Sequence, residues 1–182
     1  MIRGLLCTFI IVLAAFVSGC GRWAVKSGTI KVKDYSLTVP DGWMRDYFSN
    51  DLLLSRNGVL LQRFQVKRIN VKDELENTKK TFRKGMLPHE QAQLIIDSIS
   101  KSEKVRNFVV IANKPVAING LTGFRIEYKY RDDGDLPYHC LYYGFMKDEW
   151  FYGISFEAPE RYYFEKYAPE FEESVRTFTV YR

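Results

Sequence analysis

The chain has 182 residues, of which 46% are hydrophobic, 15% aromatic and 27% charged. This composition excludes an intrinsically disordered chain, and the length suits one domain with one hydrophobic core. The formal net charge of +5 is mildly basic but too diffuse to indicate nucleic-acid binding, so we expect no nucleic-acid partner.

The N-terminus predicts an export signal. Arg3 is followed by the apolar run 5–16, LLCTFIIVLAAF. This run is too short to cross a hydrocarbon layer of about 30 Å, which needs roughly 20 helical residues. A positive start, a short apolar stretch and small residues at its end are typical of a secretory signal peptide rather than of a membrane-spanning helix.

The signal ends in Val17-Ser18-Gly19-Cys20, which resembles the lipobox of bacterial lipoproteins. The resemblance implies that the chain is cut before Cys20 and that this cysteine carries acyl chains such as palmitate, which hold the protein at a membrane of the cell envelope. Gly21 then implies the periplasmic face of the outer membrane in a Gram-negative organism, or the outer face of the single membrane in a Gram-positive one. The alternatives are a secreted protein with a chance cysteine and an uncleaved N-terminal anchor.

The expected organisation is a cleaved signal peptide at 1–19, a lipidated tether at 20–28 and a single α+β domain at 29–182. Cys7 leaves with the signal and Cys20 is lipidated, so Cys140 has no partner for an intramolecular disulfide. We expect the Cys140 thiol to be buried.

Period-two alternation predicts strands in the first part of the domain, at 29–33 and 35–39. The segments 52–56 and 59–69 also have strand patterns, and they flank Asn57-Gly58. Because Asn-Gly accepts the positive φ angles of a two-residue turn, these two segments predict a hairpin.

The middle of the chain predicts two helices. Asp73 and Glu76 have the spacing of a capping box, which favours a short helix ending near Arg83. Pro88 suits the first turn of a second helix. The apolar residues of this second helix fall on one stripe that would face a sheet, namely Ala92, Ile95, Ile96 and Ile99.

The pattern then returns to period two and predicts an antiparallel meander with strands at 108–112, 122–131, 138–146 and 150–158. Asn119-Gly120 and Asp148-Glu149 are expected to be the tight turns of two hairpins. Pro115 marks either a break in a strand or the edge of the sheet.

A last helix is predicted over 160–176, followed by a short strand at Phe178 and Val180. One face of this helix is apolar, with Phe164, Tyr167, Ala168, Phe171 and Val175. Pro169 lies inside the pattern and is expected to kink the helix or restart it.

This order of elements predicts an α+β domain with helices packed on an antiparallel sheet. The segment Val39-Pro40-Asp41-Gly42-Trp43, the Ile118-Asn119-Gly120 turn, the aromatic strands at 138–158 and the ending Ser174 to Phe178 resemble the PsbP-like fold. That resemblance implies a docking or assembly role more often than catalysis, and it supplies no catalytic residues to transfer.

The histidines and cysteine of the domain do not form a recognisable reactive site. His139 and Cys140 are neighbours on a predicted strand, so their side chains point to opposite faces and do not form a dyad. Cys140 shares its face with Tyr138. His89 is the other histidine, and two histidines without a ligand cluster do not predict a zinc site.

The acidic residues give no clear site either. Asp132, Asp133 and Asp135 crowd one loop but lack the spacing of a calcium loop, so we expect a solvated turn. Glu157 and Glu160 are an acid–base pair only if they share a cleft, which the sequence does not indicate. We therefore expect no catalytic residue, no metal and no cofactor.

Basic side chains recur at period two on two strands and are candidates for a partner surface. Arg125, Lys129 and Arg131 share one face of their strand, and Arg63 and Lys67 recur on another. If both strands face the same way, these residues make a basic surface for an acidic partner or lipid headgroups. The alternative is an ordinary solvent-exposed face.

The aromatic run Tyr162-Tyr163-Phe164 beside Arg161 suits either helix-to-sheet packing or an interface. Three functions remain open for the whole chain. The first is a membrane-anchored, non-catalytic binding or assembly module with an envelope protein partner. The second is a carrier of a small ligand or lipid, with an apolar cavity between sheet and helices. The third is an envelope hydrolase, with a pocket lined by at least two of Glu157, Asp132, His139 and Cys140.

Overall fold

The computed structural model describes residues 22–181, except 26, 48, 50, 59 and 60. The predicted signal peptide and Cys20 lie outside the described residues. The strands are β1 (Arg22–Ala24), β2 (Gly28–Val32), β3 (Tyr35–Val39), β4 (Met44–Asp46), β5 (Leu52–Ser55), β6 (Arg63–Asn70), β7 (Arg106–Ile118), β8 (Leu121–Arg131), β9 (Pro137–Lys147), β10 (Trp150–Pro159) and β11 (Thr179–Val180). The helical segments are α2 (Pro88–Ser100), the irregular turn η1 (Glu160–Phe164) and α3 (Glu165–Arg176).

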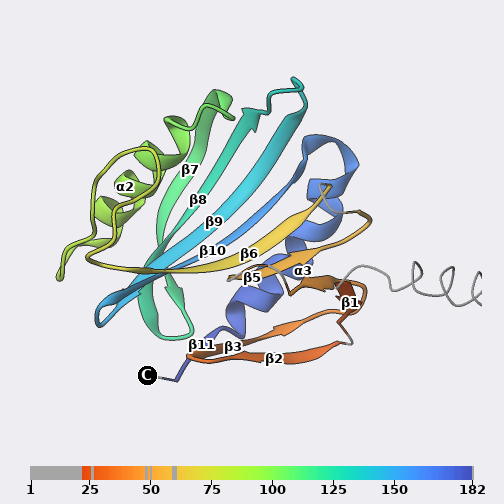
Figure 1. Ribbon diagram of the computed structural model, residues 1–182, viewed down its shortest axis with the longest axis horizontal. Coiled ribbons are helices and arrows are strands. Elements are labelled where there is room, and N and C mark those ends of the chain that lie inside the picture. Colours follow the sequence, from red (N-terminus) through yellow and green to blue (C-terminus); the bar gives the residue numbers. More distant parts are fainter. Residues whose placement is uncertain (1–21, 26, 48, 50, 59–60, 182) are drawn as a thin grey trace, which may run out of the picture.

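Eight strands form one antiparallel sheet in the order β1-β4-β5-β6-β10-β9-β8-β7, and three form a small sheet in the order β11-β3-β2 (Figure 1). The strands β7 to β10 follow one another as consecutive hairpins, as the alternating pattern predicts. This arrangement confirms the predicted α+β class with an antiparallel sheet and packed helices.

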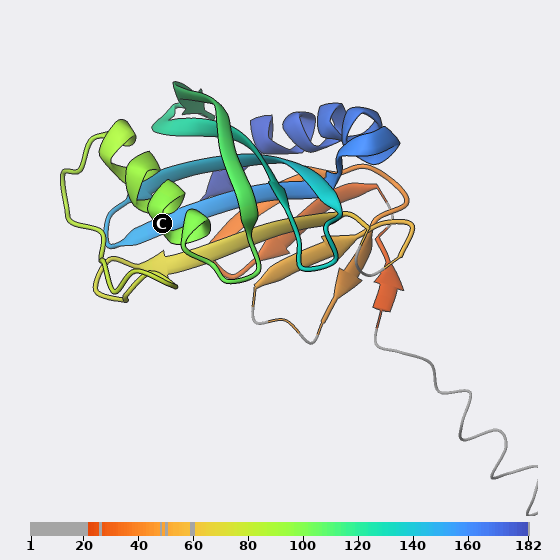
Figure 2. The same cartoon turned by 90° about the horizontal axis from the view of Figure 1, so that it is seen from above.

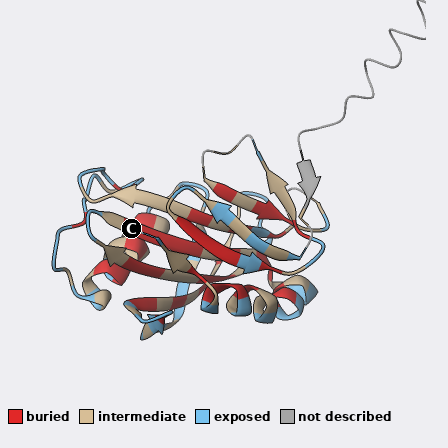
Figure 3. Ribbon diagram, turned by 90° about the horizontal axis from the view of Figure 1, so that it is seen from below, coloured by how far each residue is buried: buried red, intermediate tan, exposed pale blue. Residues whose placement is uncertain are grey.

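The two helices cover opposite faces of the large sheet, and Figure 2 shows them from above. Side chains alternate between two buried clusters because successive strand residues point to opposite faces. On one face Phe124 and Ile126 of β8 pack with Ala92 and Ile95 of α2. On the other face α3 and the small sheet cover the core. Figure 3 colours the buried segments of the strands and helices red.

Two of the predicted hairpin turns are confirmed by the register. Ile118 is opposite Leu121, and the two residues between them, Asn119 and Gly120, have φ angles of 44° and 81°. Lys147 is likewise opposite Trp150, with the turn at 148–149. Positive φ at both Asn119 and Gly120 is what a two-residue hairpin turn requires.

The hairpin at Asn57-Gly58 forms, but its connection is longer than two residues. Ser55 is opposite Arg63, so the loop covers 56–62. Asn57 still adopts a positive φ of 58°. A local turn signal therefore located the hairpin correctly but did not fix its length.

The predicted helix over 73–83 is wrong. The segment is an irregular loop in which Asn77 and Lys79 have φ angles of 64° and 53°, which interrupt any helix. Tertiary packing outweighs the local capping signal, because Leu75 and Phe82 are buried against the sheet. The Phe82 ring stacks on Phe151 with 4.1 Å between the ring centroids.

The helix at Pro88 is confirmed, with its apolar stripe against the sheet. The carboxylate of Glu90 accepts a hydrogen bond from the Leu87 backbone N–H at 2.7 Å, which satisfies one free donor at the helix start. The loop before it is fastened to the helix end, because Asn77 Nδ2 donates to the Ser98 carbonyl at 3.0 Å.

The C-terminal helix begins later than predicted. Arg161 and Tyr162 have non-helical backbone angles, with φ of 74° at Tyr162, so α3 starts at Glu165. Pro169 lies within α3 near its start, where it removes one hydrogen bond without ending the helix. The expected discontinuity therefore falls at Tyr162 rather than at Pro169.

Both ends of the large sheet differ from the sequence expectations. Pro115 lies inside β7, which runs through it as an edge strand, so the edge interpretation is confirmed and the break is not. At the other edge, β1 pairs with β4 through Arg22 opposite Asp46. This strand lies within the predicted tether 20–28, so the folded part starts before residue 29.

Candidate functional site

A cleft of about 480 Å³ opens between α2 and the large sheet. Four strands form its floor, because the side chains of β6, β8, β9 and β10 that face α2 all contribute. Its walls come from α2, from the loop at 75–77 and from residues 102–105. The helix α2 packs on β7, β8 and β9, and the same face of β6 joins the floor of the cleft beside it.

The deep side of the cleft is aromatic. Tyr128, Tyr130, Tyr138 and Tyr142 line it, together with Ile95 and Ile99 of α2. The Tyr130 ring stacks on Tyr138 with 5.3 Å between the centroids. Burial raises the pKa of the Tyr142 hydroxyl, so this group stays neutral at physiological pH.

An ion pair crosses one end of the floor. Arg63 of β6 lies opposite Glu157 of β10 and pairs with its carboxylate. Tyr130 donates a hydrogen bond to Glu157 Oε2 at 3.0 Å. Burial, and after it the Glu157 charge, raise the pKa of Tyr130, so its hydroxyl remains a donor. Glu157 is thus held between a cation and a hydroxyl.

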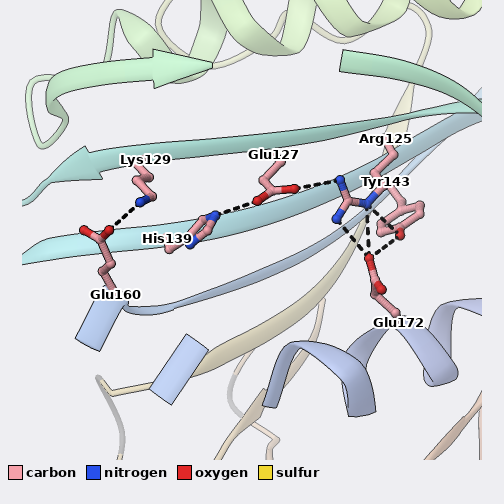
Figure 4. Close-up of polar contacts among 7 residues, drawn as sticks. All are labelled: Arg125, Glu127, Lys129, His139, Tyr143, Glu160 and Glu172. Atoms are coloured by element: carbon pink, nitrogen blue, oxygen red, sulfur yellow. Dashed lines mark hydrogen bonds and ion pairs between the residues drawn. The ribbon is translucent and has the colours of Figure 1, made fainter. Parts of the chain in front are cut away.

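The opposite face of the sheet carries a chain of polar contacts where α3 packs on it (Figure 4). Arg125 donates from Nη1 to Glu127 at 3.0 Å and from Nη2 to Glu172 at 3.0 Å. Tyr143 donates to the same Glu172 oxygen at 2.9 Å. These contacts tie β8 and β9 to α3.

The chain of contacts continues through His139. Its Nε2 lies 2.9 Å from Glu127 Oε1, and its ring stacks on Phe164 with 3.5 Å between the centroids. Burial lowers the pKa of His139, and the hydrogen bond to Glu127 opposes this only in part. Burial alone would raise the pKa of Glu127, but the hydrogen bonds from Arg125 and His139 outweigh it and lower the pKa. We infer that these hydrogen bonds stabilise the packing of α3 on the sheet.

The basic residues proposed for a partner surface do not form one surface. Across the sheet Arg125 is opposite Tyr143, Tyr143 opposite Ile154 and Ile154 opposite Val66. Directly paired residues share a face, so Arg125 lies on the Val66 side and Arg63 on the other. The condition that the two strands face the same way is therefore not met.

Each of these basic side chains also has an acidic neighbour. Lys129 pairs with Glu160, Arg131 Nη1 lies 3.1 Å from Asp135 Oδ2, and Lys67 pairs with Glu76. Arg63 and Lys67 line the cleft, whereas on the α3 face Arg125 belongs to the chain of polar contacts and Lys129 makes a separate pair with Glu160 (Figure 4). Whether any of the five contacts a partner stays a prediction.

The structure separates the other candidate groups. Cys140 is buried beneath the cleft, and burial raises the pKa of its thiol well above the usual value, while His139 points to the α3 face. Glu157 faces the cleft, but Glu160 pairs with Lys129 on the α3 side. Asp132 lines the cleft mouth and accepts a hydrogen bond from the Leu136 N–H at 2.9 Å, as in a capped turn.

Two observations concern metals and membranes. Within the described part of the chain, no three or more histidine, cysteine or acidic side chains gather where a metal ion would bind. No helix among the described residues has the length and hydrophobicity to cross a membrane.

Sequence reasoning missed the floor of the cleft, above all Tyr142 and Ser155, and the two buried glycines beneath it, Gly144 and Gly153. A signal for part of it was present. The turn at 148–149 fixes the register of β9 on β10, and this register places Gly144 opposite Gly153. The contribution of β6 had no such signal, because β6 pairs with β10 across a long stretch of sequence.

Comparison with known proteins rests on structure, because no family model and no curated protein sequence matches the chain. The structure is similar to that of cyanobacterial PsbP (CyanoP) from Synechocystis sp. PCC 6803, with a TM-score of 0.62 and 13% identity over 91% of this chain and 99% of that one. It is also similar to the Saccharomyces cerevisiae Ran-binding protein Mog1p, with a TM-score of 0.57 and 10% identity over 85% of this chain and 95% of that one.

A third similar structure is a putative regulator of unknown function from Pseudomonas aeruginosa. Its TM-score is 0.51, with 12% identity over 84% of this chain and 96% of that one. At such identities the likeness establishes the fold alone. The domain thus has a PsbP-like fold, which confirms the resemblance drawn from the sequence.

Proposed function

We propose that this protein is an exported lipoprotein whose PsbP-like domain is a non-catalytic binding or assembly module of the cell envelope. Cys20 carries the lipid that tethers the chain to the membrane, and the partner is an envelope protein or ligand at that surface. The lipobox at 17–20 supports the anchor. The Ran-binding name of Mog1p, which shares the fold, favours a binding role.

The observation that carries the non-catalytic part of this proposal is the state of the candidate reactive groups. Glu157 is held by Arg63 and Tyr130, and the Cys140 thiol is buried with a raised pKa. A general base or nucleophile needs a free group within reach of a substrate. The condition set for the hydrolase hypothesis, a pocket lined by at least two of the four named groups, is met by Glu157 and Asp132, although Arg63 and Tyr130 hold Glu157.

A second candidate function is a carrier of a small ligand, and the cleft specifically favours it. Pockets of about 300–1,000 Å³ lined by aromatic side chains and a few polar groups are the usual form of small-molecule sites. The cleft falls in this range and has that lining. It is open and partly charged, so it suits a polar ligand better than a lipid tail.

The anchor is tested by Cys20→Ala together with labelled palmitate. We expect the wild-type chain to take up the label and to fractionate with membranes, and the variant to do neither. Cys140→Ala is the matched control, because the thiol it removes is buried, and it should retain the label. A wild-type chain without label would contradict the lipoprotein proposal.

The binding role is tested by crosslinking in cells, followed by identification of the captured proteins. We expect one envelope protein to be captured reproducibly by the wild-type chain and lost with Cys20→Ala, because the variant no longer lies at the membrane. Capture of cytoplasmic proteins alone would contradict the proposal.

A further inference from the structure

Two buried glycines lie beneath the aromatic floor of the cleft and let rings pack flat on the sheet. Gly153 of β10 lies directly opposite Gly144 of β9. A Cβ atom at Gly153 would lie 2.1 Å from the Tyr142 hydroxyl oxygen, and one at Gly144 would lie 2.4 Å from Cζ of Phe124. The rings of Tyr142 and Phe124 therefore pack directly on the backbone of the two glycines, where any Cβ atom would overlap them.

Tyr142 presents this aromatic floor to the cleft. Its ring is nearly parallel to that of Phe124, with an interplanar angle of 3° and 6.2 Å between the centroids. Phe124 is buried, whereas Tyr142 is half-buried and lines the cleft. Of these two rings, a ligand in the cleft can therefore reach that of Tyr142, which packs flat on the sheet.

Polar groups stand beside the Tyr142 ring. Ser155 lies opposite Tyr142 on one side and opposite Gln65 on the other. The Ser155 hydroxyl makes no hydrogen bond to any residue that the structure describes, and Gln65 makes only a long contact of 3.4 Å to Asp51. Both groups can therefore bind a ligand without giving up a strong bond of the protein.

The charges of the cleft exclude two kinds of ligand. Arg63 pairs with Glu157 and Lys67 with Glu76, so a strongly anionic ligand finds two of the three lining cations, all but Lys104, already neutralised. An acyl chain laid along the floor would remove water from the Arg63–Glu157 pair without replacing its hydrogen bonds, which is unfavourable. The best match is a neutral molecule with flat apolar faces and hydroxyl groups at its edges.

Sugar rings have this form, because their C–H groups gather on the ring faces and their hydroxyls point outward. We infer that the cleft binds a short, uncharged glycan, with one ring stacked on Tyr142 and its hydroxyls bonded to Ser155 and Gln65. This inference rests on the proposed function as a binding module and names the class of ligand. The volume of about 480 Å³ suits a mono- or disaccharide unit.

The test uses the full chain, purified in a zwitterionic detergent that has no sugar headgroup. Cellobiose and N,N′-diacetylchitobiose are the probes, and saturation-transfer NMR detects binding. We expect saturation of the C–H protons of one ring in at least one disaccharide. Tyr142→Ala should weaken binding about tenfold, which equals about 1.4 kcal/mol. Tyr142→Phe keeps the ring and should bind nearly as well as the wild type.

Two further variants keep the test valid if Tyr142→Ala disturbs folding. Gly153→Ala should weaken binding because its Cβ displaces the Tyr142 ring, and Ser155→Ala should weaken it by removing one hydroxyl. Tyr162→Ala is the matched control, because Tyr162 is 61% exposed and is not part of the cleft. Circular dichroism of each variant establishes that it is folded.

The inference is wrong if neither disaccharide binds at about 10 mM, or if binding is insensitive to all three cleft variants. It is also wrong if trialanine binds in their place with the same sensitivity, which would assign the cleft to peptides. If glycans fail while crosslinking still captures an envelope protein, the binding module stands without this ligand. If the disaccharide binds and is cleaved, as mass spectrometry would reveal, the glycan inference stands and the non-catalytic role fails.

Discussion

The two faces of the large sheet are built in opposite ways. On the α3 face, Phe171 and Phe178 pack in the core against the sheet. The contacts from Arg125 to Glu172 join the sheet to α3 beside this core. The α2 face is covered only in part, and beside α2 it opens into a cleft in which the Ser155 hydroxyl has no hydrogen-bond partner among the described residues. The α3 face therefore supplies packing and closed hydrogen bonds, whereas the α2 face has an open cleft.

The largest expected effect is on the α3 face. Phe171 is fully buried, and its ring centroid lies 4.9 Å from that of Phe64. Phe171→Ala should lower the free energy of unfolding by about 3–5 kcal/mol, because it leaves a cavity in a packed core. Urea unfolding followed by circular dichroism measures the loss. Tyr142→Ala in the cleft should cost clearly less, and equal losses would remove the distinction between the faces.

The next effect concerns the chain of polar contacts. Glu172 accepts hydrogen bonds from Arg125 and Tyr143, so Glu172→Ala should cost about 1.5–3 kcal/mol. The neighbouring Glu173→Ala is the matched control, because that carboxylate is 65% exposed and pairs with the exposed Arg176. The control should change unfolding by less than about 0.5 kcal/mol. Similar losses for the two variants would mean that the chain adds no stability.

A smaller effect is expected from pH. Burial lowers the pKa of His139 below the ordinary value of 6.5, so the unfolded chain binds a proton more readily than the folded one. This contribution to stability is therefore complete above pH 6.5 and declines as the pH falls below it. Urea midpoints between about pH 7.5 and about pH 5.5 measure the decline.

His139→Gln should reduce that slope, because glutamine does not titrate. His89→Gln is the control, since His89 is exposed on α2 and should leave the slope unchanged. A slope that persists in His139→Gln would assign the pH dependence to other groups. It would also weaken the view that the α3 face is held by neutral His139 against Glu127.

The smallest effect is expected at the rim of the cleft. Lys67 pairs with Glu76, whose side chain is 73% exposed. Such a pair contributes little in water, so Lys67→Ala should change the free energy of unfolding by at most about 0.5 kcal/mol. A loss near that of Glu172→Ala would show that the cleft face is also stabilised by its charges.

Local signals predicted the elements whose structure is decided locally. Asn119-Gly120 imposes its turn through backbone angles, and the alternation of 122–131 fixes which side chains of β8 are buried. The stripe on α2 and the aromatic face of α3 follow from helical spacing in the same way. These features confirm the fold class.

The parts that failed depend on long-range packing. The capping pattern at Asp73 was outweighed by burial of Leu75 and Phe82 against the sheet. The relative orientation of Arg63 and Arg125 depends on the pairing of β6 with β10, which no local pattern encodes. The cleft has the same origin, since its floor combines strands that are distant in sequence.

The pairing of β1 with β4 has a mechanical consequence. β1 is three residues long, lies at the sheet edge and begins two positions after Cys20. If Cys20 is anchored as proposed, a pull on the domain loads this short strand first. Releasing 22–27 would add about 20 Å of reach at roughly 3.3–3.6 Å per residue. It would withdraw the partly buried Val25 from the edge of the core on the α3 face. Single-molecule pulling through residue 20 would reveal this as a first, small extension before the domain unfolds. Release of the edge strand would then lengthen the tether between Cys20 and the domain, so that the domain reaches a partner further from the membrane.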